Sequence, residues 1–310
     1  MNLVTMDYFI ALAEERSFTK AATRLAVTQQ TLSAHIAGVE RELGVRLVNR
    51  TVPLTLTYAG EEFLGYARRF QAERRALEQE FADIAGDVQG LLAVGIASTR
   101  GRLLMPAAIS AFSATHPGVG IQLDEAENDE LVEMLREGRA DMVVATVPRG
   151  IPGLVVRPLR EERVVLLVAE SLLRERCGDG FEEAVAQVAR TGSLASLGEI
   201  PFLLLGEGDE PGDLSRSILA RSGIRPKPKV MSKNSETLVD LAIRGVGACF
   251  VPEDLATAMM GEPEAAGLRE VSLGPEASIP IHMAWRDSGH VWSVIEAFAQ
   301  LLSHLYGDAS

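Results

Sequence analysis

The sequence predicts an α/β protein with three parts: a small N-terminal helical domain, a long connecting helix and a larger two-lobed α/β domain. A chain of 310 residues is too long for one compact core and fits one small and one or two larger units. Apolar residues recur at helical spacing over the first part, whereas apolar strands alternate with amphipathic helices from residue 91 onward. We expect boundaries at 1–58, 59–89 and 90–310, with one lobe over about 90–161 and 269–310 and the other over about 162–268.

Composition limits the class of protein. The chain has no long apolar run of the kind that spans a membrane and no signal peptide at its start, so we expect a cytoplasmic protein with no membrane partner. Cys177 and Cys249 show no CxxC spacing and have no histidine companions, so we interpret both as packing residues and expect no metal site. The net charge is −13, but residues 1–58 hold six basic and five acidic side chains, which leaves −14 on the remainder. By charge, only the N-terminal part is suited to approach nucleic acid.

Three short helices are predicted in the N-terminal domain. Phe9 and Leu12 belong to the apolar face of the first, and Ser17 offers a hydroxyl that would cap the second. Thr28 is the predicted N-cap of the third helix, and Gly44 is its predicted end. The outer face of the third helix carries amides, small side chains and a basic end: Gln29, Gln30, Ser33, Ala34, Ala37 and Arg41.

This outer face suits a helix that enters the major groove of DNA. Small side chains allow close approach, glutamine can bond adenine through two hydrogen bonds, and a helix N-terminus favours a phosphate. The alternative is that these residues only solvate an ordinary amphipathic helix. The next part of the chain argues against that alternative, because residues 47–51 and 54–57 are predicted to form a hairpin around Val52 and Pro53. Three helices and then a hairpin make a winged helix-turn-helix.

Two stretches of the N-terminal part carry a family resemblance: SFTKAATRLAVTQQTLSAHIAGVERELGVRLVNRT at 17–51 and LTLTYAGEEFL at 54–64. They resemble the N-terminal motif of LysR-type transcriptional regulators. The resemblance implies that Gln29 and Ser33 contact bases or nearby phosphates and that Arg50, in the wing, contacts the DNA backbone. The residues expected to approach DNA are Thr28, Gln29, Gln30, Thr31, Ser33, Ala34 and Arg50.

The N-terminal part departs from the family pattern at three positions. Gln30 replaces a frequent proline, and Ala34 stands where many members carry a larger polar or basic residue. We expect these two changes to affect which bases are read. Val48 stands in for a usual phenylalanine, which we interpret as a change within the core.

A long helix is predicted after the wing. Apolar residues keep helical spacing from Phe63 to Val88, and Gly90 is the predicted end. At about 1.5 Å per residue this helix would span roughly 45 Å, which is too long to lie within one small domain. We expect it to pair with its copy in a second subunit, because two recognition helices one turn of DNA apart need a two-fold axis between them. The resemblance implies a tetramer assembled from dimers, with a dimer alone as the alternative.

Two series of strands and helices predict the lobes of the C-terminal domain. The first has strands at 91–97, 119–125 and 141–147 and helices at 103–114 and 130–137. The second has strands at 202–205 and 248–251 and helices near 214–222 and 236–244. Strands at 162–168 and 279–285 are predicted to cross between the lobes, and a helix at 291–305 closes the chain. Such alternation predicts parallel sheets with helices on both faces.

The C-terminal part contains GRADMVVA and SETLVDLAIRGVGACFVPEDL, and with them it resembles the effector-binding domain of the same family, which is similar to periplasmic binding proteins. In such sheets ligands bind beyond the carboxyl ends of the strands. The resemblance implies an effector cleft lined by Ser98, Thr99, Asn128, Phe202 and Gly247. An alternative for Ser98 and Thr99 is that they are simply helix caps.

Charged residues at the expected cleft bear on the effector. Arg100 and Arg102 stand at a helix start, where either could receive a carboxylate, and we include Arg100 in the effector site. Glu207, Asp209 and Glu210 follow the facing strand and would repel a simple anion. A zwitterionic or amine-bearing effector, with its carboxylate on the first lobe, would suit both observations.

The sequence therefore predicts a transcription regulator that binds DNA and is switched by a small-molecule effector. Its expected partners are double-stranded promoter DNA, the effector, further copies of the chain and RNA polymerase, with no cofactor. An enzyme is the main alternative, but the stretch GEGDEPG at 206–212 departs from a dinucleotide fingerprint at Pro211, and no nucleophile elbow, phosphate loop or HExxH motif occurs. An exported solute-binding protein, the other alternative, would not carry the N-terminal motif.

Overall fold

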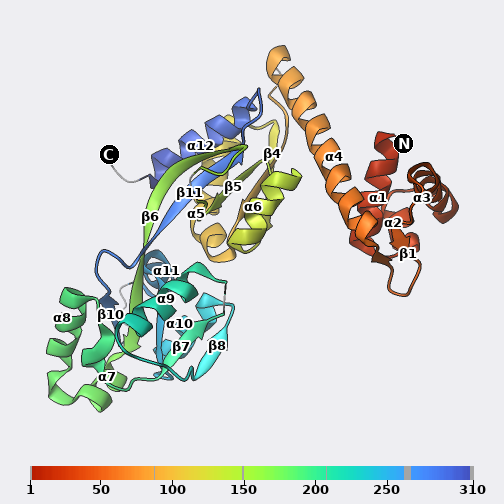
Figure 1. Ribbon diagram of the computed structural model, residues 1–310. Helices are drawn as coiled ribbons and strands as arrows, with labels where there is room; N and C mark the ends of the chain where they lie inside the picture. Colours follow the sequence, from red (N-terminus) through yellow and green to blue (C-terminus); the bar gives the residue numbers. More distant parts are fainter. Residues whose placement is uncertain (1, 87, 149, 207, 262–266, 308–310) are drawn as a thin grey trace.

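The computed structural model describes residues 2–86, 88–148, 150–206, 208–261 and 267–307. In chain order it consists of a helical domain with a hairpin, the long helix α4, and two α/β lobes (Figure 1). Figure 1 shows the N-terminal domain on one side of the molecule and the second lobe at the opposite end. Within the described ranges, no helix has both the length and the apolar character needed to cross a membrane.

The N-terminal domain is the predicted winged helix-turn-helix. Its elements are α1 (Leu3–Glu15), α2 (Phe18–Arg24), α3 (Gln29–Leu43), β1 (Val48–Asn49) and β2 (Thr55–Leu56). The Ser17 side chain caps α2 by accepting from the backbone N–H of Lys20 at 3.4 Å. Thr28 caps α3 in the same way, accepting from Thr31 at 3.0 Å, and Gly44 ends that helix in the left-handed conformation. The structure therefore confirms these caps. The sequence could predict them because each depends on residues only a few positions apart.

The wing is attached to the helices by hydrogen bonds. The carboxylate of Glu40, on α3, accepts from the backbone N–H groups of Leu47 at 2.8 Å and Val48 at 3.3 Å. Just before β2, the backbone N–H of Leu54 donates to the carbonyl of Arg16 at 3.2 Å. Val48 is 3% exposed, which confirms that its departure from the family pattern is a change within the core. The wing is therefore held in a fixed position beside α3.

Helix α4 (Tyr58–Ala85) is the predicted long helix, and its 28 residues span about 42 Å. Its predicted end at Gly90 is wrong. Gly86 takes the left-handed conformation with φ of +70° and closes the helix four residues earlier, whereas Gly90 begins the next strand. Either glycine could have ended the helix, so the pattern alone did not distinguish them.

The two lobes share one strand, β6 (Leu154–Ala169). Lobe I contains β3 (Gly90–Ile96), α5 (Ser98–Thr115), β4 (Val119–Glu125), α6 (Asn128–Glu137), β5 (Met142–Ala145), β11 (Ser278–Arg286) and α12 (Ser293–Tyr306). Lobe II contains α7 (Glu170–Cys177), η1 (Gly178–Gly180), α8 (Phe181–Thr191), η2 (Leu194–Leu197), β7 (Phe202–Leu205), α9 (Glu210–Arg221), β8 (Val230–Ser232), α10 (Ser235–Ile243), β9 (Ala248–Pro252), α11 (Glu253–Met260) and β10 (Leu268–Ser272).

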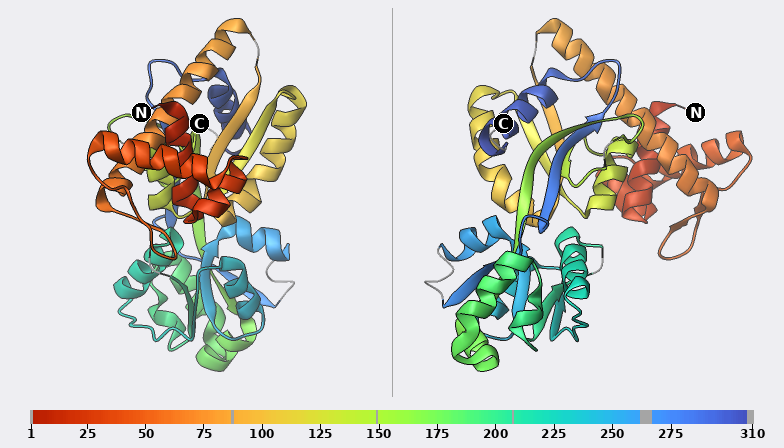
Figure 2. Two further views of the ribbon diagram at one scale, coloured as in Figure 1. Left: turned by 90° about the vertical axis from the view of Figure 1, so that its right-hand side faces the viewer. Right: turned by 60° about the vertical axis from the view of Figure 1, so that its left-hand side comes forward.

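The sheets are mixed rather than wholly parallel. The strands β4, β3 and β5 of lobe I are parallel to one another, as are β8, β7 and β9 of lobe II, in agreement with the prediction. The crossing strands differ, because β10 and β11 run antiparallel to β6. Figure 2 shows β6 extending from one lobe into the other beside β11. Strand β6 also begins at Leu154, earlier than predicted, so it contributes to both sheets.

Helix α4 packs in the core of the N-terminal domain at its start, through Phe63 and Ala67, and on lobe I over the rest of its length. Gly138, which ends α6, lies so close that an added Cβ would be 2.0 Å from the Cβ of Ala72. Near the end of α4, the carboxylate of Asp83 accepts from the backbone N–H of Ser293 at 2.9 Å and from His290 Nε2 at 2.9 Å. Burial opposes ionisation of Asp83, but the hydrogen bonds from Ser293 and His290 outweigh it and lower the pKa of this carboxyl. Lobe I and α4 therefore form one packed unit.

The turn between the wing and α4 generates a prediction at Gly60. An added Cβ there would lie 2.0 Å from the carbonyl oxygen of Leu47, so we expect Gly60→Ala to destabilise the N-terminal domain by about 2 kcal/mol. The matched control is Gly65→Ala in the same helix, where the nearest atom is the flexible end of Arg69 at 3.5 Å. Because alanine favours a helix, this control should unfold at the same or a higher temperature. Thermal unfolding followed by circular dichroism tests the pair, and equal melting temperatures for both variants would contradict the packing described.

Candidate functional site

The residues predicted to approach DNA lie together on the outside of the N-terminal domain. Six of them are exposed, namely Thr28, Gln29, Gln30, Thr31, Ala34 and Arg50. Ser33 is half-buried, one turn further along α3. The buried side of the same helix consists of Leu32, Ile36 and Val39, so the polar face is presented outward by the packing of the apolar face.

Hydrogen bonds orient several of these side chains. The hydroxyl of Thr19 donates to the amide oxygen of Gln29 at 3.3 Å, so the amide nitrogen of Gln29 is the end of this side chain that can donate to DNA. The hydroxyls of Thr28 and Thr31 bond each other at 2.8 Å. The guanidinium of Arg50 lies 5.4 Å from the centre of the Phe18 ring, which supports it in the wing. The face combines amide donors, hydroxyls and a cation, which are groups that bond base edges and phosphates.

The second candidate site is a cavity of about 330 Å³ between the two lobes. The N-terminal ends of α5 and α6 border it from lobe I, and those of α9 and α10 border it from lobe II. Its lining residues are Ala97, Ser98, Thr99, Arg100, Glu125, Ala126, Glu127, Asn128, Glu130, Glu162, Asp209, Glu210, Pro211, Lys233, Ser235 and Pro252. The cavity volume falls within the usual range for a small-molecule site.

Four of the six residues predicted for the effector site line this cavity: Ser98, Thr99, Arg100 and Asn128. Their contact with an effector stays a prediction. The N-cap of α5 is Ala97, which forms no side-chain capping bond, so neither Ser98 nor Thr99 is the N-cap.

Phe202 and Gly247 do not belong to the cavity wall, and this part of the prediction is corrected. Phe202 is 3% exposed and stacks on Phe250 in the core, with ring centres 6.0 Å apart. A Cβ added to Gly247 would lie 2.7 Å from the carbonyl oxygen of Pro201. Both residues belong to the interior of lobe II and lie at the amino ends of their strands, because Phe202 begins β7 and Gly247 directly precedes β9. The cavity lies at the carboxyl ends of these strands, where Pro252 and Asp209 line it.

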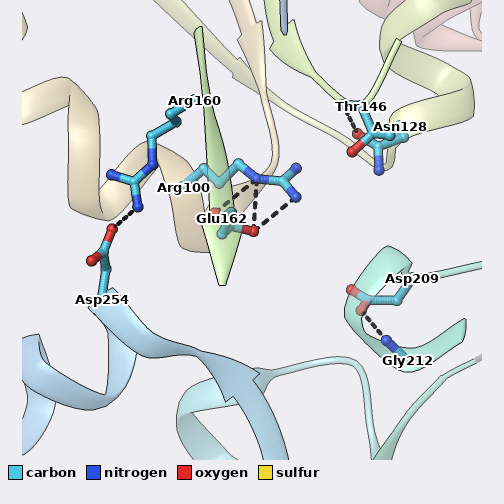
Figure 3. Close-up of polar contacts among 8 residues, drawn as sticks. All are labelled: Arg100, Asn128, Thr146, Arg160, Glu162, Asp209, Gly212 and Asp254. Atoms are coloured by element: carbon cyan, nitrogen blue, oxygen red, sulfur yellow. Dashed lines mark hydrogen bonds and ion pairs between the residues drawn. The ribbon is translucent and has the colours of Figure 1, made fainter. Parts of the chain in front are cut away.

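Arg100 is buried against a carboxylate at the back of the cavity (Figure 3). Its Nη2 donates to Glu162 Oε2 at 3.0 Å and its Nε to Oε1 at 3.2 Å. Arg100 is 4% exposed and Glu162 5%, so the pair is desolvated and its charges cancel. Arg102, the other arginine predicted at this helix start, is exposed and pairs across the lobes with Glu236 at 3.4 Å.

Acidic residues of lobe II face the pair. Asp209 caps α9 by accepting from the backbone N–H of Gly212 at 3.0 Å. Burial raises the pKa of Asp209, and the carboxylate of Glu127 in lobe I raises it further. Burial also raises the pKa of Glu210. Glu207, which was grouped with these two in the sequence, lies outside the described residues.

Sequence reasoning missed several residues of the wall, chiefly Glu127, Glu130 and Lys233. Glu127 immediately precedes α6, and Lys233 precedes the N-cap of α10. Each therefore stands between a strand and a helix, the same kind of position that identified Ser98 and Asn128. Applying the strand-end rule to these two connections would have found them.

The cysteines confirm one interpretation. Cys249 lies within β9 with no exposed surface, and burial raises its pKa to about 12. It is therefore a packing residue, since thiol reactivity requires an accessible thiolate. Cys177 is half-buried, and its thiol donates to the carbonyl of Leu197 at 3.4 Å. Among the described residues, no three histidine, cysteine or acidic side chains are arranged to hold a metal ion.

Comparison with known proteins covers both candidate sites. The family model described as "Bacterial regulatory helix-turn-helix protein, lysR family" matches residues 3–61, and that described as "LysR substrate binding domain" matches residues 85–306. A hydrogen peroxide-inducible genes activator of Haemophilus influenzae is 27% identical over 306 residues, covering 98% of this chain and 96% of that protein.

Two solved structures are similar over nearly the whole chain. A full-length OxyR from Pseudomonas aeruginosa has a TM-score of 0.72 at 22% identity, covering 98% of this chain and 94% of that chain. Full-length CbnR in complex with its target DNA has a TM-score of 0.65 at 25% identity, covering 98% of this chain and 99% of that chain.

The buried ion pair of the cavity generates the second prediction. We expect Glu162→Gln to destabilise the chain by about 3–5 kcal/mol, because Arg100 would be left buried without a counter-charge. The double variant Arg100→Met with Glu162→Met removes both charges and should recover most of this loss. Chemical denaturation of both variants measures the difference. A single variant as stable as the wild type would show that the pair is not desolvated.

Proposed function

Because the chain belongs to the LysR family of bacterial transcriptional regulators, we propose that α3 and the wing read promoter DNA while the cavity between the lobes holds the effector that controls this reading. The family makes the chain a DNA-binding transcription regulator with an effector-binding domain. The observation that carries the proposal is the exposed polar face of α3 beside Arg50. Such a regulator works where DNA is, in the cytoplasm.

We assign the roles on DNA by chemistry. Gln29 and Ser33 are the side chains placed to bond base edges, with Gln30 and Ala34 beside them on the face that enters the groove. Thr28 and Thr31 lie at the helix N-terminus, where free N–H groups favour a phosphate. Arg50 contacts the backbone from the wing and positions the domain without selecting a sequence.

We propose that α4 pairs with its copy in a second subunit. One face of α4 carries large exposed apolar side chains at steps of four, seven, four and three residues: Tyr66, Phe70, Leu77, Phe81 and Ile84. Phe81 is 62% and Ile84 72% exposed in the single chain, and this stripe lies on the opposite side of the helix from Ala72, which packs on lobe I. A second α4 would cover it. A tetramer of such dimers and a contact with RNA polymerase also stay predictions.

The proposed switch acts through lobe I. An effector that binds both walls of the cavity favours one arrangement of lobe II relative to lobe I. Since α4 is packed on lobe I, a change in how the effector domains lie against one another alters the spacing of the paired DNA-binding domains. CbnR, crystallised with its target DNA, shows that a chain of this fold can carry both parts on DNA.

The response to hydrogen peroxide that the relative's name states is not expected of this chain. A peroxide response through a thiol needs an accessible thiolate. Cys249 is fully buried with its pKa raised to about 12, and Cys177 is half-buried with its thiol bonded to the backbone.

The relatives whose names state a role are regulators of transcription, and we propose that this chain likewise performs no catalysis.

The proposed DNA reading is tested with duplexes that the full chain enriches from a random-sequence library. We expect Gln29→Ala with Ser33→Ala to weaken binding to the enriched sequence by at least about tenfold while binding to unrelated DNA stays the same. Arg50→Ala should weaken binding to all sequences and reduce the salt dependence by about one charge. Gln187→Ala, an exposed glutamine of lobe II, is the control. No enrichment by a folded wild-type chain would exclude sequence-specific reading.

The proposed pairing is tested by placing charge on the exposed stripe of α4. We expect Leu77→Glu with Phe81→Glu to give the mass of one chain in analytical ultracentrifugation at micromolar concentration, because two such helices could no longer pack together. Met231→Glu, which places a charge on another exposed apolar side chain far from α4, should leave the assembly unchanged. A wild-type chain that is itself monomeric would contradict the proposal.

A further inference from the structure

The cavity between the lobes carries an excess of negative charge. Two cations, Arg100 and Lys233, face six carboxylates, which are Glu125, Glu127, Glu130, Glu162, Asp209 and Glu210. Arg100 and Glu162 cancel each other in the buried pair. The other charged side chains of the wall are five carboxylates and one amine, so the cavity disfavours a simple anion and favours a ligand with a positive group.

These carboxylates come from both lobes and repel one another across the cavity. Burial raises the pKa of Asp209, and Glu127 of the opposite lobe contributes to this shift. Burial raises the pKa of Glu210 as well, against the effect of Arg100. The neighbouring carboxylates Asp213 and Asp209 raise it further, and Asp129 of lobe I makes the smallest contribution. A positive group placed between Glu127 and Asp209 would remove this repulsion and hold the lobes together.

The wall suits an organic cation better than a metal ion. Within the described part of the chain, no three acidic, histidine or cysteine side chains converge as metal ligands would. One carboxylate oxygen of Asp209 also accepts from the N–H of Gly212 at 3.0 Å, as the cap of α9, and is therefore less available to a metal ion. Carboxylates spread over a wide wall suit an ammonium group, whose several N–H donors point in different directions.

Lobe I offers donors for a negative group on the other side of the same cavity. Arg100 is 4% exposed, yet its Nη1 forms no hydrogen bond with a described residue, and in Figure 3 its guanidinium end points to the side where Asn128 and Asp209 lie. The amide oxygen of Asn128 accepts from the backbone N–H of Thr146 at 3.1 Å, which leaves its N–H groups as donors. Helix α5 starts here without a side-chain cap, so its first N–H groups are also available.

From this arrangement we propose that the effector is an α-amino acid, with its carboxylate on Arg100, Asn128 and the start of α5, and its ammonium group between Glu127 and the acidic pair Asp209 and Glu210. The cavity of about 330 Å³ accommodates a molecule of that size. Both charges of the ligand are needed, because each satisfies groups that belong mainly to one lobe. This proposal deepens the proposed function and rests on it.

The test is calorimetry of the full-length chain with the twenty L-α-amino acids. For each amino acid that binds, the analogue lacking the amino group and the analogue lacking the carboxyl group are measured next. We expect at least one amino acid to bind, and both of its analogues to bind at least about tenfold more weakly. If none of the twenty binds, or if a carboxylate-only analogue binds as tightly as its amino acid, the proposal is wrong.

A charge-neutral variant tests the ammonium site directly. Asp209→Asn keeps the cap of α9, since asparagine caps helices as well as aspartate does, but removes the carboxylate. We expect it to lose at least about tenfold in affinity for the amino acid. The ligand-free variant should melt at a higher temperature than wild type at neutral pH, because a carboxyl with a raised pKa loses stability as the pH rises through that pKa, and the variant has no such loss.

The matched control is Asp179→Asn, an exposed acid of lobe II away from the cavity, which should change neither affinity nor melting temperature. Equal amino acid affinity in Asp209→Asn and wild type would overturn the assignment.

DNA binding separates this proposal from the proposed function on which it rests. A ligand-free chain that selects a DNA sequence but binds no amino acid leaves the regulator intact and rejects the effector class, whereas a chain that selects no DNA rejects the regulator itself.

Discussion

The hydrogen bonding of β6 is the constraint on which the effector domain depends. This strand pairs with β11 in lobe I and with β9 and β10 in lobe II, so one continuous backbone ladder runs through both lobes. The lobes therefore cannot slide past one another without breaking that ladder, and their relative motion must occur as bending of β6 and the strands paired with it. The register between β6 and β11 shifts at Ile281 and His282, which marks an irregular point where such bending is easiest. Glu162, and with it Arg100, lies just beyond that point.

How much of this architecture the sequence predicts depends on how far apart the interacting residues are. The caps at Ser17 and Thr28 involve residues three positions apart, and both were predicted correctly. The end of α4 was misplaced because Gly86 and Gly90 are both suitable stops, and only the packing of the chain decides between them. The polar helix α7 and the short strands β8 and β10 were not predicted, because they gain stability from neighbours in lobe II rather than from their own pattern.

In the candidate sites, too, the residues that could be predicted are those whose position follows from local pattern or topology rather than from contacts distant in sequence. Ser98 and Asn128 were found because the ends of parallel strands lie at one edge of a sheet, which is a property of the topology. The ion pair between Arg100 and Glu162 joins residues 62 positions apart and has no signal in the sequence. Phe202 and Gly247 were placed by resemblance alone, and they lie at the amino ends of β7 and β9, whereas the cavity lies at the carboxyl ends.

The packing of α4 on lobe I has a consequence for how such a protein can diversify. Contacts of Ala72 with Gly138 and of Asp83 with Ser293 join α4 to lobe I, while Asp209, Glu210 and Lys233 of the cavity wall belong to lobe II. Part of the wall that discriminates by charge thus lies in a lobe that does not carry the mechanical connection. Substitutions in lobe II can alter ligand preference while the packing of α4 on lobe I is preserved. New effector specificities can therefore arise over evolutionary time without changes in the part of the molecule that reaches the DNA-binding domain.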